Sequence, residues 1–199
     1  MYKFENPDEY SEKLRDTLTK VVNKKPWDAN DILEIKNVVQ SINTHITYLI
    51  GAKFADNLGK DINSIESFKY NKMCNNGFDM EFAIEGKKIV AEIKGNIPVN
   101  SKSESYGANQ KNGIEKDISY LTNGKKKNTD YTTAESLKEA YRFLILLENN
   151  KTPIQKLINS LVKNGKYKDK YFRIWEEPFD KHCLEKCELN TINIVFVSL

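Results

Sequence analysis

Residues 77–95 read GFDMEFAIEGKKIVAEIKG, and this stretch decides the fold. β-forming residues alternate with charged ones on both sides of Glu85-Gly86, which is typical of two short strands joined by a two-residue turn. With that turn, Ile84 faces Lys87, and the same register continues outward along both strands. The stretch therefore predicts an antiparallel β-hairpin.

The register gives this hairpin two unlike faces. One face holds only apolar pairs and is expected to lie on a core. These pairs are Phe78 with Ile93, Met80 with Ala91, and Phe82 with Ile89. The other face is charged and carries Asp79, Glu81, Lys88, Glu92 and Lys94.

Two carboxylates face each other on the charged side, because the register sets Asp79 opposite Glu92. Their repulsion costs about 0.5 kcal/mol even in water. A divalent cation would relieve it, and Mg²⁺ or Mn²⁺ typically takes one or two carboxylates and keeps several waters. Lys94 projects from the same face and is positioned to meet a phosphate oxygen or an attacking water.

The spacing of these residues resembles a known nuclease signature. Asp79, twelve intervening residues and then Glu92-Ile93-Lys94 resemble the PD-(D/E)XK nuclease superfamily, which includes most restriction endonucleases. The resemblance implies that Asp79 and Glu92 hold Mg²⁺, that the Ile93 carbonyl adds a ligand and that Lys94 assists catalysis. Phe78 stands where the family usually has proline.

The resemblance also suggests second-rank site residues. The family often adds a glutamate from the helix before the hairpin, for which Glu34 is the candidate, and a polar or basic residue from the helix after it, for which Gln110 and Lys111 are candidates. Glu81 is a further candidate on the charged face of the hairpin. Ordinary solvated helix surface is the alternative interpretation of Glu34, Gln110 and Lys111.

Length and composition predict one domain. A chain of 199 residues with 39% hydrophobic content suffices for one sizeable core, so we expect a single nuclease-like domain over 1–199 with its core at about 28–147. The net charge is +3, and only three of the 31 basic residues are arginines. The lysine excess suits diffuse contact with phosphates, because bidentate reading of guanine more often uses arginine.

Cysteine usage and hydropathy bear on the compartment. Three cysteines leave an odd number and no disulfide framework, which favours a reducing, cytoplasmic location. No apolar run approaches the length needed to span a bilayer, so no membrane association is expected.

Basic side chains outside the hairpin are candidates for binding nucleic acid. Residues 125–127 form a lysine cluster in an expected loop, and residues 163–175 interleave lysines with aromatic residues, a composition suited to phosphate contact with base stacking. A solvated charge run and half-buried aromatics are the alternatives. The candidates are Lys102, Lys125, Lys126, Lys127, Lys166, Lys168, Lys170 and Arg173.

Hydrophobic periodicity predicts an α/β fold with a mixed central sheet flanked by helices. It also matches the restriction-endonuclease-like αβββαβ core that the resemblance implies. Besides the hairpin, we expect strands at 65–70, 143–147 and 191–197. We expect helices at 7–22, from Asp28 as far as Gly59, and at 110–123, 133–141 and 154–162. The helix that begins at Asp28 carries a broad apolar stripe, which we expect to be buried.

The leading functional hypothesis is a Mg²⁺-dependent DNA endonuclease of type II restriction-enzyme type. Cutting both strands would require a homodimer, and a cognate methyltransferase would act separately on the same DNA. A structure-specific resolvase or repair nuclease is one alternative. A non-catalytic nucleic-acid or protein-binding module on a nuclease-like fold is another.

Overall fold

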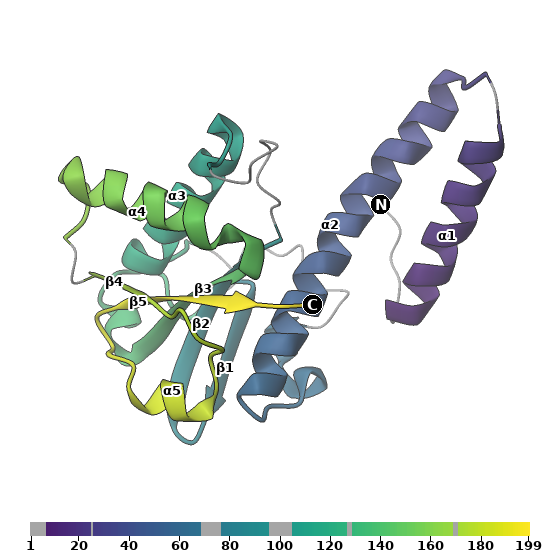
Figure 1. Ribbon diagram of the computed structural model, residues 1–199. Helices are drawn as coiled ribbons and strands as arrows, with labels where there is room; N and C mark the ends of the chain where they lie inside the picture. The colour runs from purple at the N-terminus through teal and green to yellow at the C-terminus, as the bar shows by residue number, and fades with distance from the viewer. Residues whose placement is uncertain (1–6, 25, 69–76, 96–104, 127–128, 169–170) are drawn as a thin grey trace.

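The computed structural model describes residues 7–24, 26–68, 77–95, 105–126, 129–168 and 171–199. Five strands of these segments form one mixed sheet in the order β1-β2-β3-β5-β4. β1 (Met80–Ile84) is antiparallel to β2 (Lys87–Lys94), and the rest of the sheet is parallel: β3 (Ala140–Leu147), β5 (Ile192–Val197) and β4 (Phe172–Ile174). The predicted α/β class with a mixed sheet is confirmed (Figure 1).

Helices cover both faces of the sheet (Figure 1). Ile50 and Phe54 of α2 pack in the core on one face, and Ile114 and Ile154, from α3 and α4, pack in the core on the other. Four predicted helices are confirmed: those at 7–22, from Asp28 to Gly59, at 110–123 and at 154–162. Their observed bounds are α1 Pro7–Asn23, α2 Ala29–Asn57, α3 Ala108–Asn123 and α4 Lys151–Lys163, with a short α5 at Lys181–Glu185.

The hairpin has the predicted register. Met80 pairs with Ala91, and Ile84 with Lys87. The turn residues Glu85 and Gly86 have φ angles of 50° and 78°, and two positive φ angles give a two-residue turn whose twist matches that of the flanking strands.

One residue of the predicted apolar face lies on the other side. Met80, Phe82 and Ile93 pack toward α2 as expected, but Phe78 packs with Ile114 in the core beneath α3. Because β1 begins only at Met80, the alternation of the strand does not extend to Phe78.

The strand predicted at 143–147 is buried on both faces. Phe143 and Ile145 of β3 point into the core beneath α2, while Leu144 and Leu146 point into the opposite core. β3 lies between β2 and β5, so both of its edges are paired. The last predicted strand, at 191–197, is confirmed as β5.

Two predicted elements are wrong. Residues 65–68, expected to begin a strand, lie in and beside short 3₁₀ turns at Ile62–Ser64 and Glu66–Phe68, and 69–70 fall outside the described residues. The helix expected at 133–141 is only a 3₁₀ turn at Ser136–Glu139, because Ala140 and Tyr141 pair with β2 and so belong to β3.

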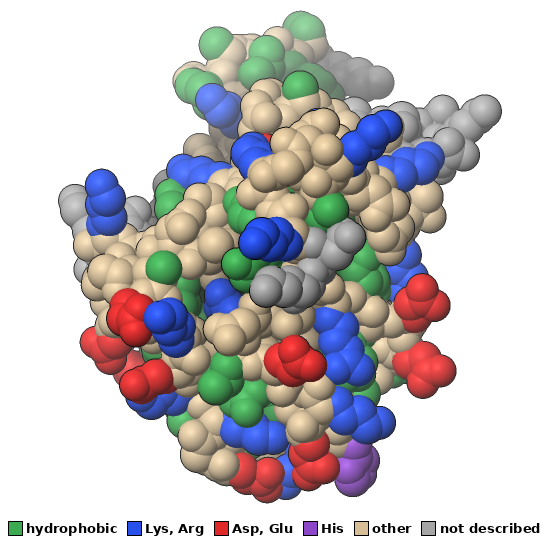
Figure 2. Space-filling view, turned by 90° about the vertical axis from the view of Figure 1, so that its left-hand side faces the viewer, with side chains coloured by type: hydrophobic (Ala, Val, Ile, Leu, Met, Phe, Trp, Pro, Cys, Tyr) green, Lys and Arg blue, Asp and Glu red, His purple; other side chains and the backbone are tan. Residues whose placement is uncertain are grey.

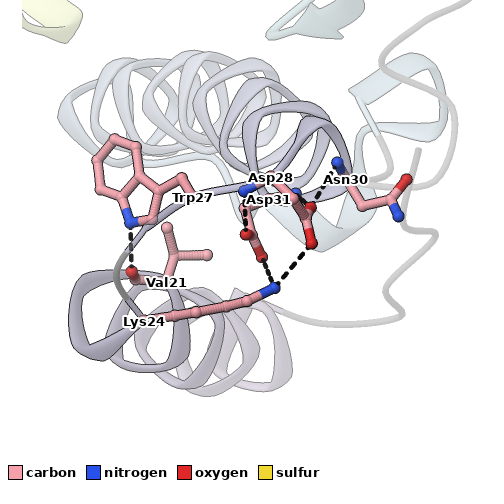
Figure 3. Close-up of polar contacts among 6 residues, drawn as sticks. All are labelled: Val21, Lys24, Trp27, Asp28, Asn30 and Asp31. Atoms are coloured by element: carbon pink, nitrogen blue, oxygen red, sulfur yellow. Dashed lines mark hydrogen bonds and ion pairs between the residues drawn. The ribbon is translucent and has the colours of Figure 1, made fainter.

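The turn between α1 and α2 is held by polar contacts (Figure 3). Asp28 caps α2 by accepting from the Asp31 backbone N–H at 3.0 Å, and Asp31 Oδ2 accepts from the Asp28 N–H at 2.7 Å. Lys24 Nζ lies 3.0 and 2.9 Å from these two carboxylates. Trp27 Nε1 donates to the Val21 carbonyl at 2.9 Å, which fixes the indole against the end of α1.

The apolar stripe of α2 is not buried along its whole length, contrary to expectation. Ile32, Leu33 and Val39 are more than half exposed, whereas Ile50 and Phe54 are fully buried. The first half of α2 contacts α1 and rises away from the sheet (Figure 1), so only the second half reaches the core. Within the described segments, no helix is long and apolar enough to cross a membrane.

Candidate active site

Asp79 and the end of β2 lie side by side. β1 begins at Met80, which pairs with Ala91, so Asp79 directly precedes the paired residues of β1 and Glu92 directly follows Ala91 on β2. Asp79 Oδ2 accepts a hydrogen bond from the Ile93 backbone N–H at 2.8 Å. The carboxylate of Asp79 is thereby held beside the Glu92-Ile93-Lys94 segment.

Glu92 is buried and contacts a lysine from a distant part of the chain. Its side chain is only 3% exposed, and Oε1 lies 2.6 Å from Lys125 Nζ. Lys125 Nζ also donates to the Gly77 carbonyl at 2.5 Å and lies over the rings of Phe78 and Tyr120, 5.1 and 5.0 Å from their centroids. The ammonium of Lys125 thus partly neutralises the buried carboxylate.

This position corrects the prediction that Lys125 is a surface lysine for nucleic acid. The chain turns sharply at Gly124, the C-cap residue of α3, where φ is +86°. A Cβ at Gly124 would lie 2.5 Å from backbone atoms of Thr132 and Thr133, so glycine permits the close approach of the two segments. The turn directs Lys125 inward to Glu92.

Lys94 pairs with a carboxylate that the sequence did not single out. Its Nζ lies 2.7 Å from Oδ2 of Asp117, whose side chain is 7% exposed. Asp117 comes from the middle of α3, on the same buried face as Ile114 and Leu121. An acidic residue on the apolar face of an amphipathic helix is the signal that marks Asp117 in the sequence.

Burial shifts the pKa values of these groups. Burial raises the pKa of Glu92 well above its ordinary value, Asp79 and Asp117 add to the rise, and Lys125 opposes it. Burial likewise raises the pKa of Asp117 to about 6, against the opposing effect of Lys94. Burial lowers the pKa of Lys94, but the carboxylates of Asp117, Asp79 and Glu92 together outweigh burial and raise it overall. Lys94 therefore remains an ammonium at neutral pH.

The donor set is compatible with one hard cation. Glu92 Oε1 and Asp117 Oδ2 are buried, and each contacts a lysine ammonium without accepting a hydrogen bond of good geometry from the described residues. The described segments contain no group of three or more His, Cys, Asp or Glu side chains arranged around a metal. Mg²⁺ needs only one or two carboxylates. Asp79 and Glu92 meet that need if Lys125 moves away from Glu92.

The second-rank candidates occupy different places. α2 approaches the end of β2 at Ile46, which contacts Gly95. Glu34 lies about 18 Å along α2 from Ile46, so α2 does not bring Glu34 to the site. Glu81 is half-buried, and burial raises its pKa while a hydrogen bond from Thr129 opposes the rise.

Gln110 and Lys111 lie at the start of α3. Gln110 Oε1 accepts from the Gly107 N–H at 3.2 Å and so completes the cap of α3. Lys111 lines a cavity of about 190 Å³ between α3 and α4. Ile93 is a buried strand residue paired with Ile145, and its carbonyl stays a predicted ligand.

The remaining basic candidates are dispersed. Lys166 forms an ion pair with Glu115, and Arg173 donates to the Lys186 carbonyl at 2.7 Å while stacking on Trp175. Lys126 and Lys168 are exposed, and Lys102, Lys127 and Lys170 lie outside the described residues. Figure 2 shows lysine and arginine side chains spread over one face, with acidic side chains among them in its lower half.

No protein-family model, no curated protein and no solved structure matches this chain. The hypotheses on its function therefore depend on the geometry of the Asp79, Glu92, Lys94, Asp117 and Lys125 cluster.

Proposed function

We propose that this protein is a Mg²⁺-dependent DNA endonuclease of type II restriction-enzyme type. The observation that carries the proposal is the hydrogen bond of Asp79 to Ile93, which holds two carboxylates and Lys94 together at the end of β2. The order α2, β1, β2, α3, β3 supports the resemblance to the PD-(D/E)XK nucleases, since it agrees with their αβββαβ core in every element but the first strand.

In this proposal the lysines and carboxylates of the cluster have distinct tasks. Asp79 and Glu92 would hold Mg²⁺, which when bound would lower the pKa of a water and stabilise charge on the phosphate. Asp117 positions the ammonium of Lys94 through their 2.7 Å contact, and Lys94 then faces a phosphate oxygen or the nucleophilic water. Lys125 neutralises Glu92 in the metal-free site.

The proposed partner is DNA, bound by a homodimer with one site per strand. A structure-specific resolvase or repair nuclease stays open, because both would use the same cluster. The dispersed basic side chains do not select among these substrates.

A second candidate is a non-catalytic binding module, and one observation favours it. Lys125 already supplies a positive charge to Glu92 at 2.6 Å, so the buried carboxylate has a counter-charge without a metal. The two candidates differ in metal binding: the nuclease requires Mg²⁺ or Mn²⁺ at Asp79 and Glu92, whereas the binding module requires none.

Cleavage of supercoiled, linear and branched DNA with Mg²⁺ or Mn²⁺ tests the proposal. We expect discrete products that disappear in EDTA and in Asp79→Ala and Glu92→Gln variants. The matched control is Glu139→Gln, which removes an exposed glutamate whose one ion pair among the described residues is with Lys88 and should cut normally. Metal-independent DNA binding without cutting of any substrate would favour the binding module.

A further inference from the structure

α2 carries an apolar stripe with heptad spacing from Ile32 to Leu49. Ile32, Ile35, Val39, Ile42, Ile46 and Leu49 recur at alternating intervals of three and four residues, as the a and d positions of a coiled coil do. Ile32 is 58% exposed and Val39 51% exposed, while Ile35 and Ile42 are half-buried. The residues of α2 buried on the side of α1 are instead Asp31, Val38 and Ser41. Ile35 and Ile42 lie on the helix face of these buried residues, whereas Ile32 and Val39 lie about 100° around the helix and stay exposed.

α1 adds apolar residues to the same side of the α1–α2 hairpin. Leu18 and Val22 each follow a buried residue of α1, namely Thr17 and Val21, by one position. On α2, Ile32 and Val39 follow the buried Asp31 and Val38 in the same way. One position rotates a side chain by about 100°, and because the helices are antiparallel, this rotation moves both sets to the same side of the hairpin.

We propose that this surface, defined by Leu18, Val22, Trp27, Ile32 and Val39, binds the same surface of a second copy of the chain. The two α1–α2 hairpins would then form a four-helix bundle. Isoleucine at both a and d positions, as at Ile32, Ile35 and Ile42, favours more than two helices, which agrees with a bundle of four helices from two hairpins. The α1–α2 hairpin rises away from the sheet, and Figure 2 shows hydrophobic side chains exposed at its end.

The exposed apolar area reaches the lower limit for a specific dimer. The exposed parts of these five side chains amount to on the order of 500 Å² per copy, so pairing would bury roughly 1,000 Å² in total, and a specific interface buries at least about 1,000 Å². The proposed dimer does not rest on the nuclease function, because no residue of the active-site cluster enters the argument.

Sedimentation equilibrium of the full chain tests this interface. We expect a species of about 46 kDa, twice the 23.0 kDa chain. An Ile32→Glu/Val39→Glu variant buries two charges in the interface and should raise the dissociation constant by roughly 100-fold or more. The matched control is Leu33→Glu, since Leu33 is 57% exposed on the same helix but outside the heptad stripe, and it should remain dimeric.

Circular dichroism separates loss of the dimer from loss of the fold. If the double variant unfolds, Val22→Glu probes the same surface from α1, where 63% exposure makes the substitution harmless to the monomer. A wild-type chain that stays at 23.0 kDa at about 100 µM would overturn the proposal. A folded variant that still dimerises as the wild type does would also overturn it, as would equal weakening by Leu33→Glu.

Discussion

At the scale of single residues, Glu92 and Asp117 carry most of the electrostatic cost of the site. Each is a nearly inaccessible carboxylate next to one lysine, and burial raises both pKa values. Removing either lysine would leave a buried charge uncompensated, which is strongly destabilising. The two ion pairs are therefore sensitive both to substitution and to pH.

The pH dependence of stability follows from the direction of these shifts. The folded pKa of Asp117 is about 6, against an ordinary value of 3.8, so the folded state binds more protons than the unfolded state between these values. Stability from Asp117 is then present at low pH and is lost as the pH rises from about 4 to about 6, and Glu92 acts in the same direction. In the wild type we expect the free energy of unfolding to fall by on the order of 2 kcal/mol over this pH range. In Asp117→Asn this fall should be absent.

Urea denaturation at a series of pH values measures this effect. Asp56→Asn is the control, because Asp56 is exposed and its carboxylate forms one ion pair among the described residues, with the exposed Lys53. If the wild type and Asp117→Asn show parallel curves between pH 4 and 6, Asp117 is not the group that titrates there.

Lys125 gives a second prediction at this scale. Lys125→Met should lower the free energy of unfolding by about 3 kcal/mol in EDTA at pH 7, because Glu92 loses its counter-charge. If Glu92 is a metal ligand, Mn²⁺ at 100 times its dissociation constant should restore about 2.7 kcal/mol. Thermal denaturation with and without Mn²⁺ measures both quantities. Lys126→Met, at the neighbouring exposed lysine, should show neither effect, and a Lys125→Met protein that Mn²⁺ does not stabilise would argue against metal binding.

At the scale of elements, the end of α3 determines whether Lys125 reaches Glu92. Gly124 has φ +86° and no room for a Cβ, so Gly124→Ala should destabilise the protein by about 2 kcal/mol or more and displace Lys125. Gly113→Ala offers a matched comparison on the same helix: Gly113 has open space around it, and alanine should stabilise by about 0.5–1 kcal/mol. Chemical denaturation of both variants measures the difference. Equal effects would show that the Gly124 turn tolerates a side chain.

The same elements show what the sequence can predict. The hairpin follows from neighbouring residues, because the Glu85-Gly86 turn and the alternation around it are local. The helix expected at 133–141 fails because Ala140 and Tyr141 pair with a strand some fifty residues earlier, a contact that no local pattern encodes. Asp117 and Lys125 reach the site only because α3 packs on the sheet, so the predicted cluster lacked two of its five charged members.

At the scale of the whole molecule, the two proposals make a joint prediction. One active site cuts one strand, so a nuclease that dimerises through the α1–α2 hairpin should linearise supercoiled DNA in one binding event. The Ile32→Glu/Val39→Glu variant keeps Asp79, Glu92 and Lys94, and as a monomer it should still nick one strand. We therefore expect nicked circles to accumulate with this variant, and linear product to form at least about tenfold more slowly than with the wild type at equal concentration.

Gel electrophoresis of a cleavage time course measures both products, with Leu33→Glu as the control that should linearise like the wild type. The outcomes separate the two proposals, because nicking and linearisation report on different parts of the molecule. A dimeric wild type that cuts nothing contradicts the nuclease and leaves the interface intact. A variant that is monomeric by sedimentation yet linearises as fast as the wild type contradicts a role of this interface in double-strand cutting. Nicking without linearisation, lost again in Glu92→Gln, is the result that both proposals require, because the chemistry then lies at β2 and the pairing of sites lies at α2.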